Sequence, residues 1–164
     1  MRLLAPVVIG AALLAAPDCH AQNRLGRPWG LWVMPAFGNY GEYGCRGFCG
    51  HEAVAVTVSW QPSSIVLTAR STFAAGNNDN WDFKDAGVLV GYGTRPGRLI
   101  HTHLGIGVGY GHASEGTDAG LTVPFEAQLA WRAFPVVGFA IYGWGTMTGP
   151  LGGLGLGIQI GKLR

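Results

Sequence analysis

Apolar side chains recur at every second position along several long segments of this chain. A period of two is the signature of a β-strand, in which successive side chains point to opposite faces. The alternation is clearest in residues 52–60, 99–113, 121–132 and 154–161, and it is weaker in 28–40, 64–74, 81–93 and 136–147. No segment after Gln22 has a helical period. The sequence therefore predicts an all-β fold with eight strands.

The breaks between these segments alternate in length and polarity. Tight turns occur at 61–63, 94–97 and 133–135, whereas longer or more polar breaks occur at 41–51, 75–80, 114–119 and 148–152. Short turns at one end and longer loops at the other are typical of an antiparallel up-and-down β-barrel of the outer membrane, with the short turns on the periplasmic side. An even number of strands places both termini at the same end. We therefore predict an eight-stranded antiparallel up-and-down transmembrane β-barrel.

The composition of the face opposite the apolar one favours a membrane barrel. That face consists mostly of Gly, Ala, Thr and Ser with isolated charges, and only 12% of the chain is charged, against about 25% in soluble domains. A soluble barrel would turn its apolar face inward and would need a charged exterior. The apolar face is therefore expected to contact lipid. The alternative is a soluble periplasmic ligand-binding barrel of the lipocalin type.

Aromatic residues also concentrate near the predicted strand ends. Trp29, Trp60, Tyr92, Trp131 and Phe134 fall near the turns, and Tyr40, Phe73, Trp81, Tyr110 and Trp144 fall near the loops. Two belts of amphipathic rings are favoured at the two membrane–water interfaces. This placement predicts such belts on the exterior.

The N-terminus has the pattern of an export signal. Arg2 is followed by an apolar run over residues 3–16 and then by Cys19-His20-Ala21, which predicts a signal peptide over 1–21 with cleavage after Ala21. The run is shorter than the roughly 20 apolar residues needed to span a bilayer. The barrel would then form from residues 22–164.

Two cysteines remain in that segment, Cys45 and Cys49, with glycines beside both. An even pair in an exported protein predicts a disulfide. A metal site that uses the two thiols with His51 is the alternative, but further thiols are lacking.

By this architecture the chain resembles the small eight-stranded outer-membrane β-barrels of the OmpA/OmpX type. The resemblance implies a location in the outer membrane, contact with its lipid and lipopolysaccharide, insertion by the barrel-assembly machinery and a monomeric state. It also implies a structural, envelope-stability or surface-interaction role without a wide pore, and no cofactor. Such barrels commonly end in an aromatic residue, whereas this chain ends in Lys162-Leu163-Arg164. The net charge of +2 and the scattered Lys and Arg residues give no sign of nucleic-acid binding.

Charged residues on the inward parity predict a polar cluster in the lumen. Arg70 and Glu126 both fall near the middle of their strands, and a buried charge requires a partner. We expect Arg70 to meet Glu126, with Thr68, Gln128 and Gln159 nearby, as a polar plug or, alternatively, a gate for ions. His101 and His103 share the inward parity; a His-x-His pair can bind metal, but no third ligand lies nearby in the sequence, so no metal site is expected.

One short motif suggests an enzyme. His112 and Ser114, with Glu126 twelve residues after the serine, resemble the His-x-Ser…Glu arrangement of PagL, the outer-membrane lipid A deacylase. The resemblance implies a serine that is activated by histidine and attacks an acyl ester. His112 and Ser114 have outward parity and Glu126 has inward parity, so the three residues meet only if a bulge at Pro124 shifts the register. The non-enzymatic interpretation is therefore the leading one.

Overall fold

A computed structural model describes residues 30–42, 49–75, 81–95, 99–112, 119–148 and 151–162. Most of these residues lie in β-strands, which are joined by turns. The strands are β1 (Gly30–Glu42), β2 (Cys49–Gln61), β3 (Ile65–Ala75), β4 (Trp81–Thr94), β5 (Ile100–His112), β6 (Ala119–Thr122), β7 (Pro124–Phe134), β8 (Val137–Thr146) and β9 (Leu151–Lys162). In these ranges no helix is long and apolar enough to cross a bilayer.

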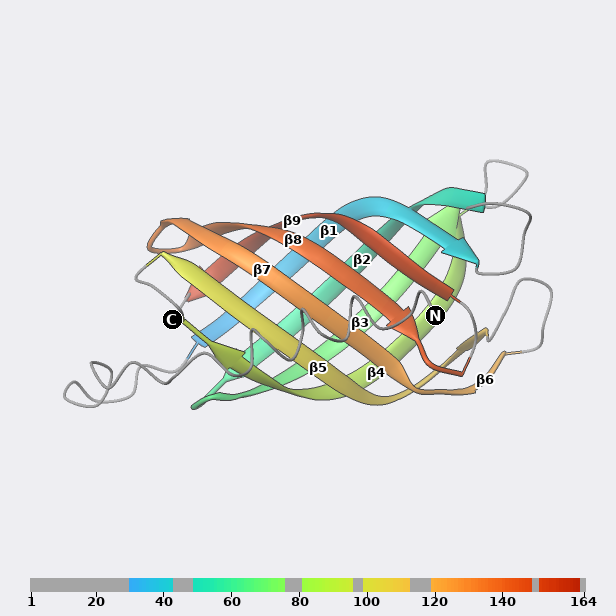
Figure 1. The fold of residues 1–164 in the computed structure, drawn as a ribbon, viewed down its shortest axis with the longest axis horizontal. Helices are drawn as coiled ribbons and strands as arrows, with labels where there is room; N and C mark the ends of the chain where they lie inside the picture. The colour runs from blue at the N-terminus through green and yellow to red at the C-terminus, as the bar shows by residue number, and fades with distance from the viewer. Residues whose placement is uncertain are drawn as a thin grey trace, which may run out of the picture.

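The strands close into a barrel in which each pair of neighbouring strands is antiparallel. The sheet runs β4-β3-β2-β1-β9-β8-β7-β5, and an additional pairing of β4 with β5 closes it. β6 and β7 both pair with β5 and occupy successive parts of one position in the sheet. The barrel is therefore eight-stranded, as predicted. Figure 1 shows the strands tilted around a common axis, with the β7–β8 hairpin at the left.

The two ends of the barrel are named by their connections. The turn end carries the short connections β2–β3, β4–β5 and β7–β8, together with the start of β1 and the end of β9. The loop end is the opposite one, at the right in Figure 1. This division agrees with the alternation of short and long breaks in the sequence.

The position in the sheet that β6 and β7 share is interrupted at Val123, between the end of β6 at Thr122 and the start of β7 at Pro124. Proline has no N–H to donate to the ladder, which accounts for a break inside a strand. The interruption does not shift the register: Tyr110 on β5 faces Leu121 before it, and Ile106 on β5 faces Phe125 after it. Four residues therefore separate the two pairs on each strand, and side chains keep their parity across Pro124.

Apolar side chains cover the outside of the barrel, as the alternation predicted. Large apolar residues on the outward parity are exposed along every long strand, among them Val33, Phe37, Val58, Leu67, Val88, Val108, Leu129, Ile141 and Leu156. Inward residues such as Thr57, Thr68, Arg70 and Gln128 are buried. The orientation is the reverse of that in a soluble barrel.

The predicted aromatic belt is correct at four residues of the turn end and partly wrong at the loop end, while Trp29 and the side chain of Trp81 lie outside the described residues. Trp60, Tyr92, Trp131 and Phe134 at the turn end are exposed, and so are Phe73 and Tyr110 at the loop end. Tyr40 and Trp144 instead point inward, with exposed fractions of 4% and 1%. They share parity with buried neighbours, so alternation overrides their position near a strand end.

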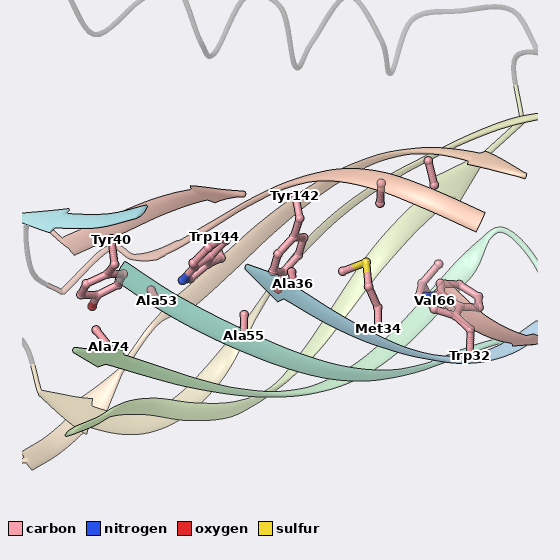
Figure 2. Close-up of a cluster of buried hydrophobic side chains, with 12 residues drawn as sticks. Trp32, Met34, Ala36, Tyr40, Ala53, Ala55, Val66, Ala74, Tyr142 and Trp144 are labelled. Atoms are coloured by element: carbon pink, nitrogen blue, oxygen red, sulfur yellow. The ribbon is translucent and has the colours of Figure 1, made fainter. Parts of the chain in front are cut away.

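The lumen is filled by side chains along much of its length. Figure 2 shows Trp32, Met34, Tyr142, Trp144 and Tyr40 following one another along the interior. Glycines give these large groups room. A Cβ at Gly153 would lie 2.6 Å from ring carbons of Trp144, and one at Gly157 would lie 2.8 Å from the Met34 sulfur. An eight-stranded barrel is just wide enough for side chains to fill.

Candidate functional site

Arg70 lies in the middle of β3 and spans the lumen. One guanidinium nitrogen, Nη2, forms an ion pair with the carboxylate of Asp85 on the neighbouring strand β4. The other, Nη1, donates a hydrogen bond of 2.7 Å to the carbonyl oxygen of Phe125 on β7, and Nη2 also lies 3.3 Å from the carbonyl oxygen of Gly145 on β8. Because β3 lies across the closed sheet from β7 and β8, one side chain connects opposite walls.

Glu126 lies near this arginine in the lumen and accepts a hydrogen bond from an aromatic side chain. The Tyr142 hydroxyl donates a hydrogen bond of 2.7 Å to Glu126 Oε2. His103 Nδ1 lies 3.5 Å from Glu126 Oε1, and both side chains are fully buried. Arg70 is close enough to interact electrostatically with Glu126 and Tyr142. We refer to Arg70, Asp85, Glu126, Tyr142 and His103 as the lumen network.

Uncharged polar groups continue the interior on either side of this network. Gln159 on β9 donates a hydrogen bond of 3.0 Å to the side-chain oxygen of Gln128 on β7. The hydroxyls of Ser59 and Thr68 are 3.0 Å apart on β2 and β3. These residues are all buried, so the hydrogen bonds offset the loss of hydration.

The structure places the predicted lumen residues inside the barrel but gives Arg70 a different primary partner. Thr68, Arg70, Glu126 and Gln128 are all buried in the lumen. The direct ion pair of Arg70 is with Asp85, a residue that was not among those predicted for the lumen cluster. Asp85 has the same parity as inward Leu89, opposite to the exposed Val88 and Val90, so alternation alone would have identified it.

The residues of the PagL-like motif are separated among the described strands. Glu126 faces Gly105 on β5 and points into the lumen. His112 ends β5 at the loop end and faces Ala119. Seven residues along β5 correspond to roughly 23 Å. The unshifted register at Pro124 keeps Glu126 on the inward side, and Ser114 lies outside the described residues.

Other predicted features fall partly outside the described residues. The signal peptide at 1–21, Cys45 and the side chain of Cys49 are among these, so the disulfide stays a prediction. His101 and His103 do lie on the inward side near the turn end, where the His101 ring packs edge-on against Trp32 at 5.5 Å. No group of three or more His, Cys, Asp or Glu residues in the described part of the chain could hold a metal ion.

A broad hollow lies on the apolar exterior of the described strands. It extends over β1, β5, β7, β8 and β9, has a volume of about 650 Å³ and is lined by outward side chains that include Phe37, Leu129, Trp131, Phe139, Ile141 and Leu156. In water, an apolar surface of this extent would drive association. Against hydrocarbon it carries no such penalty, which makes the exterior a lipid-facing surface.

Apolar residues outside, hydrogen-bonded polar residues inside and a closed antiparallel sheet define a small transmembrane β-barrel. No protein-family model matches the chain, and no curated protein matches it in sequence. Its structure is similar to the crystal structure of Neisserial surface protein A (NspA), with 12% identity, 82% of this chain and 97% of that chain covered, and a TM-score of 0.54. It is also similar to a de novo designed transmembrane β-barrel, with 13% identity, coverage of 79% and 94%, and a TM-score of 0.52.

A third similar structure is Ail, the attachment invasion locus protein of Yersinia pestis, in complex with the heparin analogue sucrose octasulfate. It shares 10% identity over 81% of this chain and 95% of that chain, with a TM-score of 0.48. NspA and the designed barrel share only 12% and 13% sequence identity with this chain, so the similarity shows the fold alone. That fold is the small transmembrane β-barrel, which has eight strands in this chain.

Proposed function

We propose that this protein is a closed β-barrel of the bacterial outer membrane with a structural, envelope-stability or surface-interaction role and no wide pore. One observation carries the proposal: the lumen network and the aromatic side chains beside it occupy the interior, while the exterior is apolar. A barrel of this kind presents lipid with an apolar wall and leaves only its two ends in water. Its contacts with other molecules are then made through those ends.

The lumen network supports a role as a plug. Arg70 reaches across from β3 to β7 and β8, so it lies in the path that an ion would follow. Tyr142 and Trp144 stack at 5.2 Å between ring centroids on the inner face of β8. The buried charge pair and the stacked rings support the proposal that the barrel has no wide pore.

Membrane insertion is tested by fractionation together with gel mobility. We expect the expressed protein to remain with outer membranes after a urea wash, and the unboiled protein to migrate differently from the boiled protein. Recovery in the soluble periplasm, with no mobility change on boiling, would contradict the proposal and favour a soluble barrel. The Lys84→Gln variant, changed in a charge pair with Asp82 outside the lumen network, is the matched control and should behave as the wild type does.

The closed lumen is tested by conductance in planar lipid bilayers. We expect the wild type to give no steady steps of porin size. A double variant, Arg70→Ala with Trp144→Ala, removes the transverse side chain and one of the stacked rings, and it should conduct measurably if it folds. Large steady steps from the wild type would show that the plug interpretation is wrong.

A further inference from the structure

The charges of the lumen network do not balance when His103 is neutral. Arg70 carries one positive charge and interacts electrostatically with two carboxylates, those of Asp85 and Glu126. Arg70 and Asp85 are each 2% exposed and Glu126 is 1% exposed, so water screens these charges little. A buried charge without a partner is costly because it has lost its hydration. With two ionised carboxylates and a neutral histidine, the network would hold one such negative charge.

His103 and Glu126 are placed to share the proton that removes this charge. His103 Nδ1 lies 3.5 Å from Glu126 Oε1, and both side chains are fully buried. The other carboxylate oxygen, Oε2, accepts the hydrogen bond from the Tyr142 hydroxyl. Neither ring nitrogen of His103 has a hydrogen-bond partner among the described residues. One proton on either group of the pair would bring the charge of the network to zero.

The other titratable residues on the inward parity lie toward the two ends of the barrel. Those at the turn end are His101, Arg95 and Arg132, and those at the loop end are Tyr40, Glu42, His51 and Asp82. The inward positions of β9 carry no titratable side chain. Arg70 and Asp85 are therefore the charged side chains of the described interior that accompany the pair within the network.

We propose that His103 and Glu126 form a proton-binding site that holds one exchangeable proton in the folded barrel. The proton is carried by the imidazole or by the carboxyl group, and the two groups titrate as a unit because their charges interact at this separation. Loss of this proton, or gain of a second one, leaves a net charge inside the barrel. The inference goes beyond the proposed role as a plug, since it makes the stability of the plug depend on pH.

The site predicts how stability changes with pH, because the folded and unfolded chains then bind different numbers of protons. Free Glu and His side chains have pKa values of about 4.3 and 6.5. Between these two pH values the unfolded chain also carries one proton on the pair, so folding takes up none and stability is constant. Above about pH 6.5 the unfolded histidine loses its proton while the folded site keeps it. The barrel therefore becomes less stable as the pH rises.

Urea-induced unfolding in phosphatidylcholine vesicles, from about pH 4.5 to about pH 8.5, covers both regions. The reference is the double variant Glu126→Gln with His103→Gln, which removes the site and keeps the Arg70–Asp85 pair. Relative to this variant, the unfolding equilibrium constant of the wild type should be constant below about pH 6.5. Above that pH it should rise by up to about tenfold per pH unit, the value for one proton.

Single variants separate the two groups of the site. In His103→Gln, Glu126 must hold the proton alone, so the rise should begin above about pH 4.3. In Glu126→Gln, the Arg70–Asp85 pair balances itself beside a neutral histidine. The equilibrium constant should then be constant above about pH 6.5 and should rise as the pH falls below it. His51→Gln, at the loop end of β2, is the matched control and should keep the wild-type profile.

A wild-type profile that runs parallel to that of the double variant above about pH 6.5 would overturn the inference, because the folded barrel would then hold no additional proton. The absence of a rise in His103→Gln between about pH 4.3 and 6.5 would overturn it as well. If a single variant does not fold, the wild type and the double variant decide the question by themselves. Failure of the proposed function is a separate result, since a protein that does not insert is recovered without vesicles at every pH.

Discussion

Arg70 on β3 donates a hydrogen bond of 2.7 Å to the carbonyl oxygen of Phe125 on β7, across the width of the lumen. The same guanidinium pairs with Asp85 on β4. A single side chain thereby fixes the separation of two opposite walls and neutralises a buried carboxylate. A planar guanidinium with five donors suits this role better than an ammonium group.

Replacing Arg70 by Met should destabilise the barrel by about 3–5 kcal/mol, because it leaves the buried Asp85 without a partner charge. The measurement is urea-induced unfolding in lipid vesicles, followed by gel mobility of unboiled samples. Arg70→Lys should retain part of the stability, since an ammonium group can pair with Asp85 but makes fewer contacts across the lumen.

The double variant Arg70→Met with Asp85→Leu is the control for this interpretation. Removing both charges should recover most of the loss, as replacement of a buried ion pair by apolar groups is often nearly neutral. An unfolding curve for Arg70→Met that matches the wild type would mean that the ion pair contributes little to stability.

The identity of the residues in the lumen could be predicted from alternation, but their pairing could not. Arg70 and Glu126 both have inward parity and are both buried. The choice of Asp85 as the ion-pair partner depends on the register of β3 against β4, where Thr72 faces Asp85 and a bulge brings Phe73 opposite Phe83. A one-residue insertion of this kind has no clear signal in the sequence.

Which side chains point outward could be predicted more reliably from their parity in the strand than from their position along it. Tyr40 and Trp144 lie near strand ends and were expected in an aromatic belt, yet they are buried. Tyr40 has the parity of Met34 and Ala36, and Trp144 has that of Tyr142, all of which are buried. Because side chains alternate strictly between faces, parity decides the side before an interfacial preference can act.

Gly153→Ala should destabilise the barrel by about 1–3 kcal/mol, as expected for overpacking. A Cβ there would lie 2.6 Å from ring carbons of Trp144 and 2.9 Å from the carbonyl oxygen of Asn39. Thermal unfolding, read as the temperature at which the mobility of unboiled protein changes, measures the effect. Gly120→Ala is the matched control, since a Cβ at Gly120 has no atom within 4 Å. Equal transition temperatures for the two variants would contradict close packing of Trp144 on Gly153.

Lipid A from cells that express the wild type and from cells that express Ser114→Ala should carry the same acyl chains. The physical reason is the separation of Glu126, which faces the lumen opposite Gly105, from His112 at the loop end of β5. Mass spectrometry of extracted lipid A makes the comparison, with cells lacking the protein as the reference. Loss of an acyl chain with the wild type, reversed by Ser114→Ala, would instead establish a deacylase.

A cation introduced on the apolar exterior should lower the stability of the folded barrel by an amount that depends on its depth in the membrane. Val88 lies near the middle of β4 and is 62% exposed, and Leu121 lies near the loop end in β6 and is 81% exposed. Val88→Arg should destabilise the folded barrel in vesicles by about 2–4 kcal/mol, whereas Leu121→Arg should cost about 0–1 kcal/mol. Urea titration in vesicles measures both values. In a water-soluble barrel, an added surface charge at either position would have little effect on stability. Nearly equal costs at Val88 and Leu121 would therefore contradict a transmembrane orientation, because water on the outside makes the two positions equivalent.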